Sequence, residues 1–268
     1  MEKWLLDFFD DQLKRWSFAA KNAKALENVQ KKEFRLGDLN GYVQFNPSRA
    51  VSTLAKLDKN TLSSRPCFLC TGNRPKEQKA FEILPGWDLL VNPFPILPYH
   101  FTIVNKNHIP QDINNETGLR LASKLSGMVV FYNDVGAGAS APDHMHFQAV
   151  PLEELPLIRL LEKEWDNFEE LKLPFKIMTD PSKILENKRP LNCFYWQSGG
   201  SLRFVAIWRK AHRPKAYFLE PPLRRAFSPG AIDMTGVLVT PLKEDFEAIN
   251  FEDIEKIYRE VAFTNEEG

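Results

Sequence analysis

A glycine-rich run followed directly by an alternating stretch constrains this chain most. Residues 133–140 are Asn-Asp-Val-Gly-Ala-Gly-Ala-Ser, and residues 144–150 are His-Met-His-Phe-Gln-Ala-Val. Glycines break helices and permit tight turns, and period-two alternation is typical of a β-strand. His144, His146 and Gln148 are therefore predicted to share one face of a strand that follows a sharp turn.

The side chains of this region suit chemistry at phosphorus. A largely neutral imidazole can attack phosphorus and form a reactive phosphoramidate. Gln148 can hydrogen-bond a nucleotidyl phosphate without adding negative charge, the backbone at Gly136 and Gly138 can approach phosphate oxygens, and Ser140 adds a hydroxyl donor. A metal site or buried packing is the alternative for the paired histidines, and an ordinary turn is the alternative for the glycines.

A second motif is Cys67-Phe-Leu-Cys70, whose spacing lets two thiolates bind one Zn²⁺. The chain has five histidines that could complete a tetrahedron; reduced, partly buried thiols are the alternative. The chain has only three cysteines, which do not make a secreted disulfide framework and fit a reducing compartment.

Composition narrows the possible partners. Lys plus Arg and Asp plus Glu both total 35, so no global charge excess favours a nucleic-acid polymer or an anionic membrane. Acidic residues interrupt the apolar residues at the start of the chain, unlike a signal peptide, and no stretch reaches membrane-spanning length. We therefore expect a cytoplasmic protein that binds neither a nucleic-acid polymer nor a membrane.

Periodicity predicts strands and helices in a mixed order. Alternating or β-rich apolar runs predict strands, and helical spacing predicts helices. The predicted strands are short segments within 34–45, then 81–84, 87–91, 101–104, 144–150, 201–208, 215–219 and 235–240. The predicted helices are 4–16, 119–132, 157–171 and 251–263.

These motifs together resemble one branch of the histidine-triad superfamily. This branch contains galactose-1-phosphate uridylyltransferase, diadenosine tetraphosphate phosphorylase and GDP-hexose phosphorylase. Its third histidine is replaced by glutamine, as in His144-Met-His146-Phe-Gln148. The resemblance spans most of the chain, and it implies that His146 is the nucleophile and Gln148 its catalytic partner.

The resemblance also implies a fold and a substrate pocket. The expected fold is α+β and HIT-like, with two related halves of antiparallel sheets flanked by helices. Residues 1–155 would form a catalytic half with the zinc-binding segment, and residues 156–268 a degenerate half that completes the pocket. Lys210, His212 and Arg213 would reach the substrate phosphates or form a solvated basic edge. The expected substrate-binding residues are Asn92, Phe94, Asn133, Gly138, Ser140 and Arg213.

The cysteine motif resembles the zinc-binding start of the uridylyltransferase, which implies that His108 and His144 complete a structural zinc site. The sequence departs from the family patterns in two respects. Asp143 is one extra residue before His144 relative to the phosphorylases. His212 is the only histidine after His146, so no second histidine-rich metal site is expected.

The resemblance implies a nucleotidyltransferase or phosphorylase that works through a nucleotidyl-histidine. Its donor would be a nucleotide sugar of the GDP-hexose type or a dinucleoside polyphosphate. Phosphate is the favoured acceptor, before a sugar 1-phosphate or water. A hexose-1-phosphate uridylyltransferase-like enzyme, a non-catalytic nucleotide-binding module and a metallohydrolase remain alternatives, and the protein is expected to be a monomer or homodimer.

Overall fold

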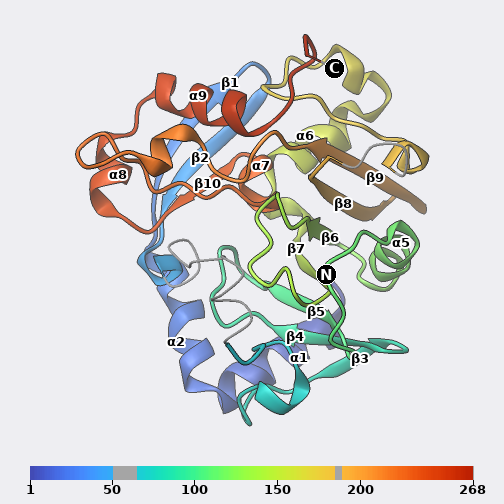
Figure 1. Cartoon of the computed structure of the whole chain (residues 1–268). Coiled ribbons are helices and arrows are strands. Elements are labelled where there is room, and N and C mark those ends of the chain that lie inside the picture. Colours follow the sequence, from blue (N-terminus) through green and yellow to red (C-terminus); the bar gives the residue numbers. More distant parts are fainter. Residues whose placement is uncertain (51–64, 185–188, 268) are drawn as a thin grey trace.

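The computed structural model describes residues 1–50, 65–184 and 189–267, which form two sheets with flanking helices (Figure 1). The larger sheet has the antiparallel order β3-β4-β5-β7-β6-β8-β9, and the smaller has the order β1-β2-β10. The strands are β1 Gln30–Leu36, β2 Leu39–Phe45, β3 Phe81–Leu84, β4 Trp87–Val91, β5 Phe101–Asn105, β6 Met128–Asn133, β7 His146–Pro151, β8 Leu191–Ser198, β9 Ser201–Trp208 and β10 Val237–Thr240. The helices are α1 Lys3–Arg15, α2 Ser17–Ala25, α5 Asn115–Lys124, α6 Pro156–Glu164, α7 Ala231–Met234, α8 Lys243–Ala248 and α9 Phe251–Val261.

Both faces of the larger sheet are buried. Leu5 of α1 and Leu121 of α5 belong to the core on one face, together with Phe147 of β7. The other face packs against the smaller sheet, α6 and α9, and this core includes Phe131 of β6 and Trp196 of β8. The expected α+β fold of antiparallel sheets and flanking helices is confirmed, with β2 and β10 as a parallel pair in the smaller sheet.

Strand β7 lies between β5 and β6 in the middle of the larger sheet. His146 pairs with Val104 and Gln148 with Thr102 of β5. Since Phe147 points into the α1/α5 core, His146 and Gln148 share the opposite face. The strand begins at His146, so the predicted strand start at His144 was wrong, and His144 belongs to the preceding turn.

Two other element predictions were wrong. The predicted helix over 119–132 is α5 followed by β6, because the chain turns at Gly127, whose φ is +77°. Every residue of β6 is buried, and such a continuous apolar run has no period that separates a strand from a helix. The predicted strand over 215–219 is a short 3₁₀ helix, Lys215–Phe218, which follows Pro214.

Each sheet contains strands from both of the expected halves, residues 1–155 and residues 156–268. β8 extends the larger sheet by pairing with β6, and β10 extends the smaller sheet by pairing with β2. The division at residue 155 into a catalytic and a degenerate half stays a prediction. Among the helices of residues 1–50, 65–184 and 189–267, none is long and apolar enough to cross a membrane.

Candidate active site

His146 and Gln148 open onto a cavity of about 700 Å³. Its wall includes Trp16 and Phe18 from the first part of the chain and residues 230–233 from the last part. The structure brings together in its wall all but one of the predicted catalytic and substrate-binding residues. These are Asn92, Phe94, Asn133, Gly138, Ser140, His146 and Gln148.

The hydrogen bonds of His146 define its tautomer. The residue is 3% exposed, and its Nδ1 lies 2.8 Å from the backbone carbonyl oxygen of His144. Because a carbonyl only accepts, Nδ1 carries the proton and Nε2 of the neutral ring keeps its lone pair. Burial lowers the pKa of His146 to about 4, mainly by desolvation, which favours the neutral ring.

Gln111 holds the backbone around His146. Its Oε1 accepts from the His146 N–H at 2.8 Å, and its Nε2 donates to the carbonyls of His146 and Asn133, both at 2.9 Å. The side chain thus ties the start of β7 to the end of β6. Gln111 was not predicted from the sequence, because an isolated glutamine in a loop carries no motif.

Gln148 is oriented by His100, which precedes β5. The Ile96 N–H donates to His100 Nδ1 at 3.2 Å, and His100 Nε2 lies 2.8 Å from Gln148 Oε1. Burial lowers the pKa of His100 to about 3, and the positive charge of Arg49 adds to this effect. The neutral His100 ring therefore carries its proton on Nε2 and donates to the glutamine oxygen.

Arg49 supports the segment that contains Asn92 and Phe94, two of the predicted substrate-binding residues. Asn92 Oδ1 accepts from the Phe94 N–H at 2.9 Å, and the Phe94 carbonyl accepts from Arg49 Nη1 at 2.7 Å. Burial raises the pKa of Asp233 to about 6, although Arg49 and two backbone N–H groups partly oppose this shift. Arg49 and Asp233 line the cavity, but neither was among the residues predicted to bind the substrate.

The glycine-rich run is packed tightly against the C-terminal part of the chain. Gly138 has φ +97°, and a Cβ there would lie 2.6 Å from Gly230 Cα. Asn133 Oδ1 accepts from Asn192 Nδ2 at 2.9 Å and from the Ala231 N–H at 2.7 Å. The Asn133 side-chain oxygen therefore holds the loop in place.

Arg213 does not belong to the cavity wall. Its Nε donates to Ser228 Oγ at 3.0 Å, and its guanidinium carbon lies 4.2 Å from the centre of the Tyr217 ring. Ser228 itself lines the cavity, and His212 Nε2 lies 2.9 Å from its hydroxyl. Lys210 donates to the Arg259 carbonyl at 3.1 Å. A phosphate contact of Arg213 stays a prediction.

The four predicted zinc ligands converge on one point. The Nδ1 atoms of His108 and His144 are 3.3 Å apart, and Cys67 Sγ lies 3.3 Å from His144 Nδ1. Cys70 Sγ lies 3.2 Å from His108 Nδ1, and all four ligand atoms are within 4.8 Å of one another. Typical zinc bond lengths and tetrahedral angles give N–N and N–S separations of about 3.3 and 3.5 Å.

The surroundings of these four residues also fit a metal. His144 Nε2 lies 2.7 Å from the Asn105 carbonyl oxygen, so Nε2 carries the proton. The lone pair of Nδ1 is therefore free to bind a metal ion between the four ligand atoms. Leu69 packs with Val104 and Leu90, which anchors the cysteine turn on the larger sheet. The cluster can therefore hold one metal ion close to the start of β7.

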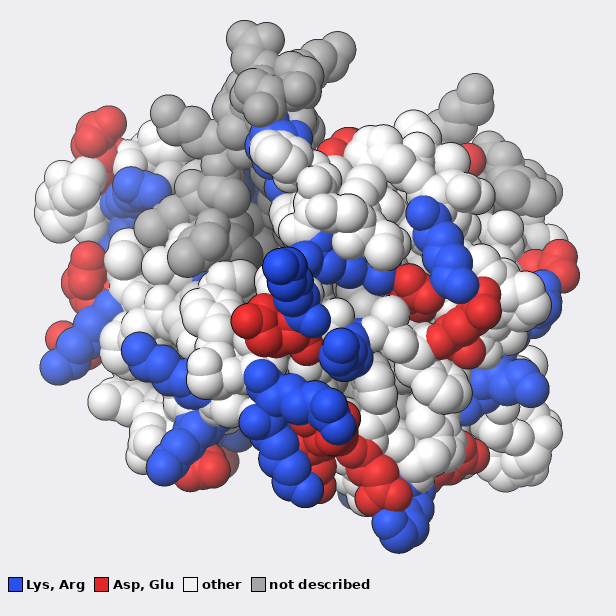
Figure 2. Space-filling view, turned by 90° about the horizontal axis from the view of Figure 1, so that it is seen from below, with Lys and Arg blue, Asp and Glu red and all other residues white. Residues whose placement is uncertain are grey.

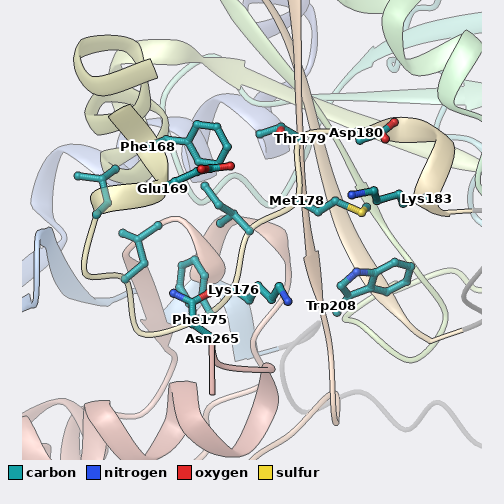
Figure 3. A pocket seen from close by; sticks show the side chains of 13 residues that line it. Phe168, Glu169, Phe175, Lys176, Met178, Thr179, Asp180, Lys183, Trp208 and Asn265 are labelled. Carbon is teal, nitrogen blue, oxygen red and sulfur yellow. The ribbon is translucent and has the colours of Figure 1, made fainter. Parts of the chain in front are cut away.

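A larger hollow of about 880 Å³ lies elsewhere in the molecule (Figure 3). Phe168 and Glu169 lie on one side of it and Asp180 and Lys183 on another, with Met178 between them. Among the described residues, those that line this hollow include neither histidine nor cysteine, the groups on which the expected chemistry depends. On the face in Figure 2, basic and acidic side chains are intermixed, in keeping with their equal numbers.

Comparisons with known proteins agree with this fold. The crystal structure of yeast Ap4A phosphorylase Apa2 in complex with Ap4A is similar with a TM-score of 0.62 and 16% identity, over 98% of this chain and 99% of that chain. The complex with AMP gives a TM-score of 0.61 and 17% identity, over 99% of both chains. The chain therefore has the same fold as an enzyme of the expected branch.

Two further comparisons concern the sequence itself. No curated protein matches the chain. The family model described as "Domain of unknown function (DUF4922)" matches residues 8–151, more than half of the sequence, including the cysteine pair and β7. The chain belongs to the DUF4922 family.

Proposed function

We propose that this protein is a phosphorylase-type nucleotidyltransferase that forms a covalent nucleotidyl intermediate on His146 Nε2. The observation that carries the proposal is the bond between His146 Nδ1 and the His144 carbonyl. It leaves Nε2 as the unprotonated nitrogen of a ring that lines a cavity. Gln148, on the same face of β7, supplies an amide beside this nucleophile.

The reaction has two displacement steps. In the first, the Nε2 lone pair attacks the α-phosphorus, a P–N bond forms, and the P–O bond to the distal phosphates breaks, so the leaving oxygen takes the electron pair. In the second, a phosphate oxygen attacks the same phosphorus and the P–N bond breaks. The Gln148 amide and backbone N–H groups near Gly138 would stabilise charge on the nonbridging oxygens.

A dinucleoside polyphosphate is the favoured donor class. The structures with the same fold are of an Ap4A phosphorylase in complex with Ap4A and with AMP. The cavity, which has several aromatic residues in its wall, can hold a nucleoside with part of its phosphate chain. A nucleotide sugar of the GDP-hexose type shares the bond that breaks, so it belongs in the same test.

Zinc would act as a structural ion in this proposal. Cys67, Cys70, His108 and His144 would hold it, and the ion would fix the turn that leads into His146. The protein residues carry out both displacement steps. Residues 156–268 would complete the substrate pocket, to which they contribute Ser228 and residues 230–233.

The test is the intact mass of the protein after incubation with single donors in the absence of phosphate. Wild type and His146→Ala are compared with diadenosine tetraphosphate, GDP-hexoses and UDP-hexoses, and the samples are quenched at alkaline pH because phosphoramidates are acid-labile. We expect a nucleotidyl mass gain on wild type only, and loss of the adduct when phosphate is added. An adduct on both proteins, or on neither with any donor, would contradict the proposal.

A further inference from the structure

Arg65 lines the same cavity as His146 and is held there by three contacts. Its Nη2 lies 3.1 Å from Asp143 Oδ1 and 3.5 Å from the Ser140 carbonyl oxygen. Its guanidinium carbon lies 4.9 Å from the centre of the Phe68 ring. The side chains of Arg65 and Asp143 are 25% and 24% exposed, so the ion pair is partly shielded from water.

The guanidinium keeps donors for a ligand. Within residues 1–50, 65–184 and 189–267, both of its hydrogen bonds come from Nη2, and the buried Nε has no partner. Guanidinium has five N–H donors in a rigid plane, which matches phosphate geometry. An arginine anchored at one corner by a carboxylate is pre-organised to donate from the rest of that plane.

Arg65 and the other arginine in the cavity wall contact different segments. Arg49 donates to the carbonyl of Phe94, one of the predicted substrate-binding residues, whereas Arg65 contacts the carbonyl of Ser140 at the end of the glycine-rich run. In the proposed function the α-phosphorus lies at His146, so the phosphates beyond it need a separate cation. Asp143, the residue that is extra relative to the phosphorylase pattern, forms the ion pair that anchors Arg65.

We propose that Arg65, positioned by Asp143 and Phe68, binds the phosphates distal to the α-phosphate of the nucleotide donor. This inference rests on the proposed function, which places the α-phosphate at His146. Its consequence is a dependence on phosphate number: Arg65 contributes to binding of the donor but not of a nucleoside monophosphate.

The experiment measures dissociation constants in a His146→Asn background, where the donor is not consumed. The ligands are diadenosine tetraphosphate and AMP, or a GDP-hexose and GMP if that donor labels wild type. We expect Arg65→Gln to weaken donor binding about tenfold or more, because it removes charge-assisted bonds, and to change nucleoside monophosphate binding less than about twofold. Arg65→Lys should fall between Arg65→Gln and the parent.

Lys76→Ala is the matched control, because Lys76 is an exposed cation of the same region that does not line the cavity. It should change neither constant more than about twofold. An equal loss for donor and monophosphate with Arg65→Gln, or a loss for neither, would overturn the role of Arg65. Adduct formation on wild-type His146 is measured separately, so the proposed function can survive either result.

Discussion

His100 Nε2 lies 2.8 Å from Gln148 Oε1, and this contact determines which end of the Gln148 amide is left for a substrate. The His100 ring donates because its other nitrogen accepts from the Ile96 N–H. The glutamine oxygen is therefore occupied, and its NH₂ group remains available to donate to a phosphate oxygen. His100 acts here as a positioning residue for Gln148.

Gln148→Glu tests this polarity with almost no change of shape. The glutamate can still accept from His100, but it cannot donate when ionised, and it repels a phosphate. We expect adduct formation on His146 to slow about 100-fold, as when one donor to a reacting oxyanion is lost. Single-turnover mass measurements give the rate, and an unchanged rate would exclude Gln148 as a phosphate donor.

Gln111→Leu tests the clamp around His146. The substitution leaves the His146 N–H and two carbonyls without their buried partner, and each such group costs about 1–3 kcal/mol. We expect the free energy of unfolding to fall by about 3 kcal/mol in urea titrations. Gln30→Leu, at an exposed position of β1, is the control and should change it by less than about 0.5 kcal/mol. Equal effects of both variants would refute the clamp.

Local sequence predicted those parts of the fold where the residue pattern has a clear period. β7 alternates, so its shared face of His146 and Gln148 followed from the sequence alone. β6 is buried on both faces, so it has no alternation, and the helix predicted over 119–132 included it wrongly. The parallel pairing of β2 with β10 depends on contacts between the chain ends, which local patterns do not record.

The candidate site likewise contains residues that were predicted from the sequence and residues that were not. The cluster of Cys67, Cys70, His108 and His144 was predictable because cysteine spacing and a family resemblance pointed to these four residues, and the structure places their ligand atoms together. Gln111 and Asp233 were missed because they act through backbone contacts that exist only in the folded chain. The orienting role of His100 likewise depends on the pairing of β5 with β7.

Gly138→Ala tests the close packing of the glycine-rich run. A side chain at φ +97° costs about 1–2 kcal/mol, and contact with Gly230 adds about 1–3 kcal/mol of overpacking. Gly86→Ala is the matched control, since φ is +82° there but the added Cβ meets nothing within 4 Å. We expect Gly138→Ala to unfold at lower urea and to form the His146 adduct more slowly, while Gly86→Ala shows only the backbone cost. Equal losses for the two variants would mean that the loop does not need this close approach.

Metal removal tests the cluster of Cys67, Cys70, His108 and His144. We expect one zinc per chain by elemental analysis of freshly purified protein, and none in Cys67→Ser, because a tetrahedral site rarely survives the loss of one thiolate. Cys193→Ala is the matched control: this buried thiol lies on β8, outside the cluster, so its loss should leave the zinc content unchanged.

The same variants separate a structural ion from a catalytic one. A structural zinc fixes the turn before β7, so Cys67→Ser should lower both the melting temperature and the rate of adduct formation, since His146 lies two residues beyond His144. Wild-type protein without zinc would show that the four residues pack as thiols and imidazoles alone. If zinc-free Cys67→Ser kept the parent melting temperature but lost all adduct formation, the ion would instead act in the chemical step.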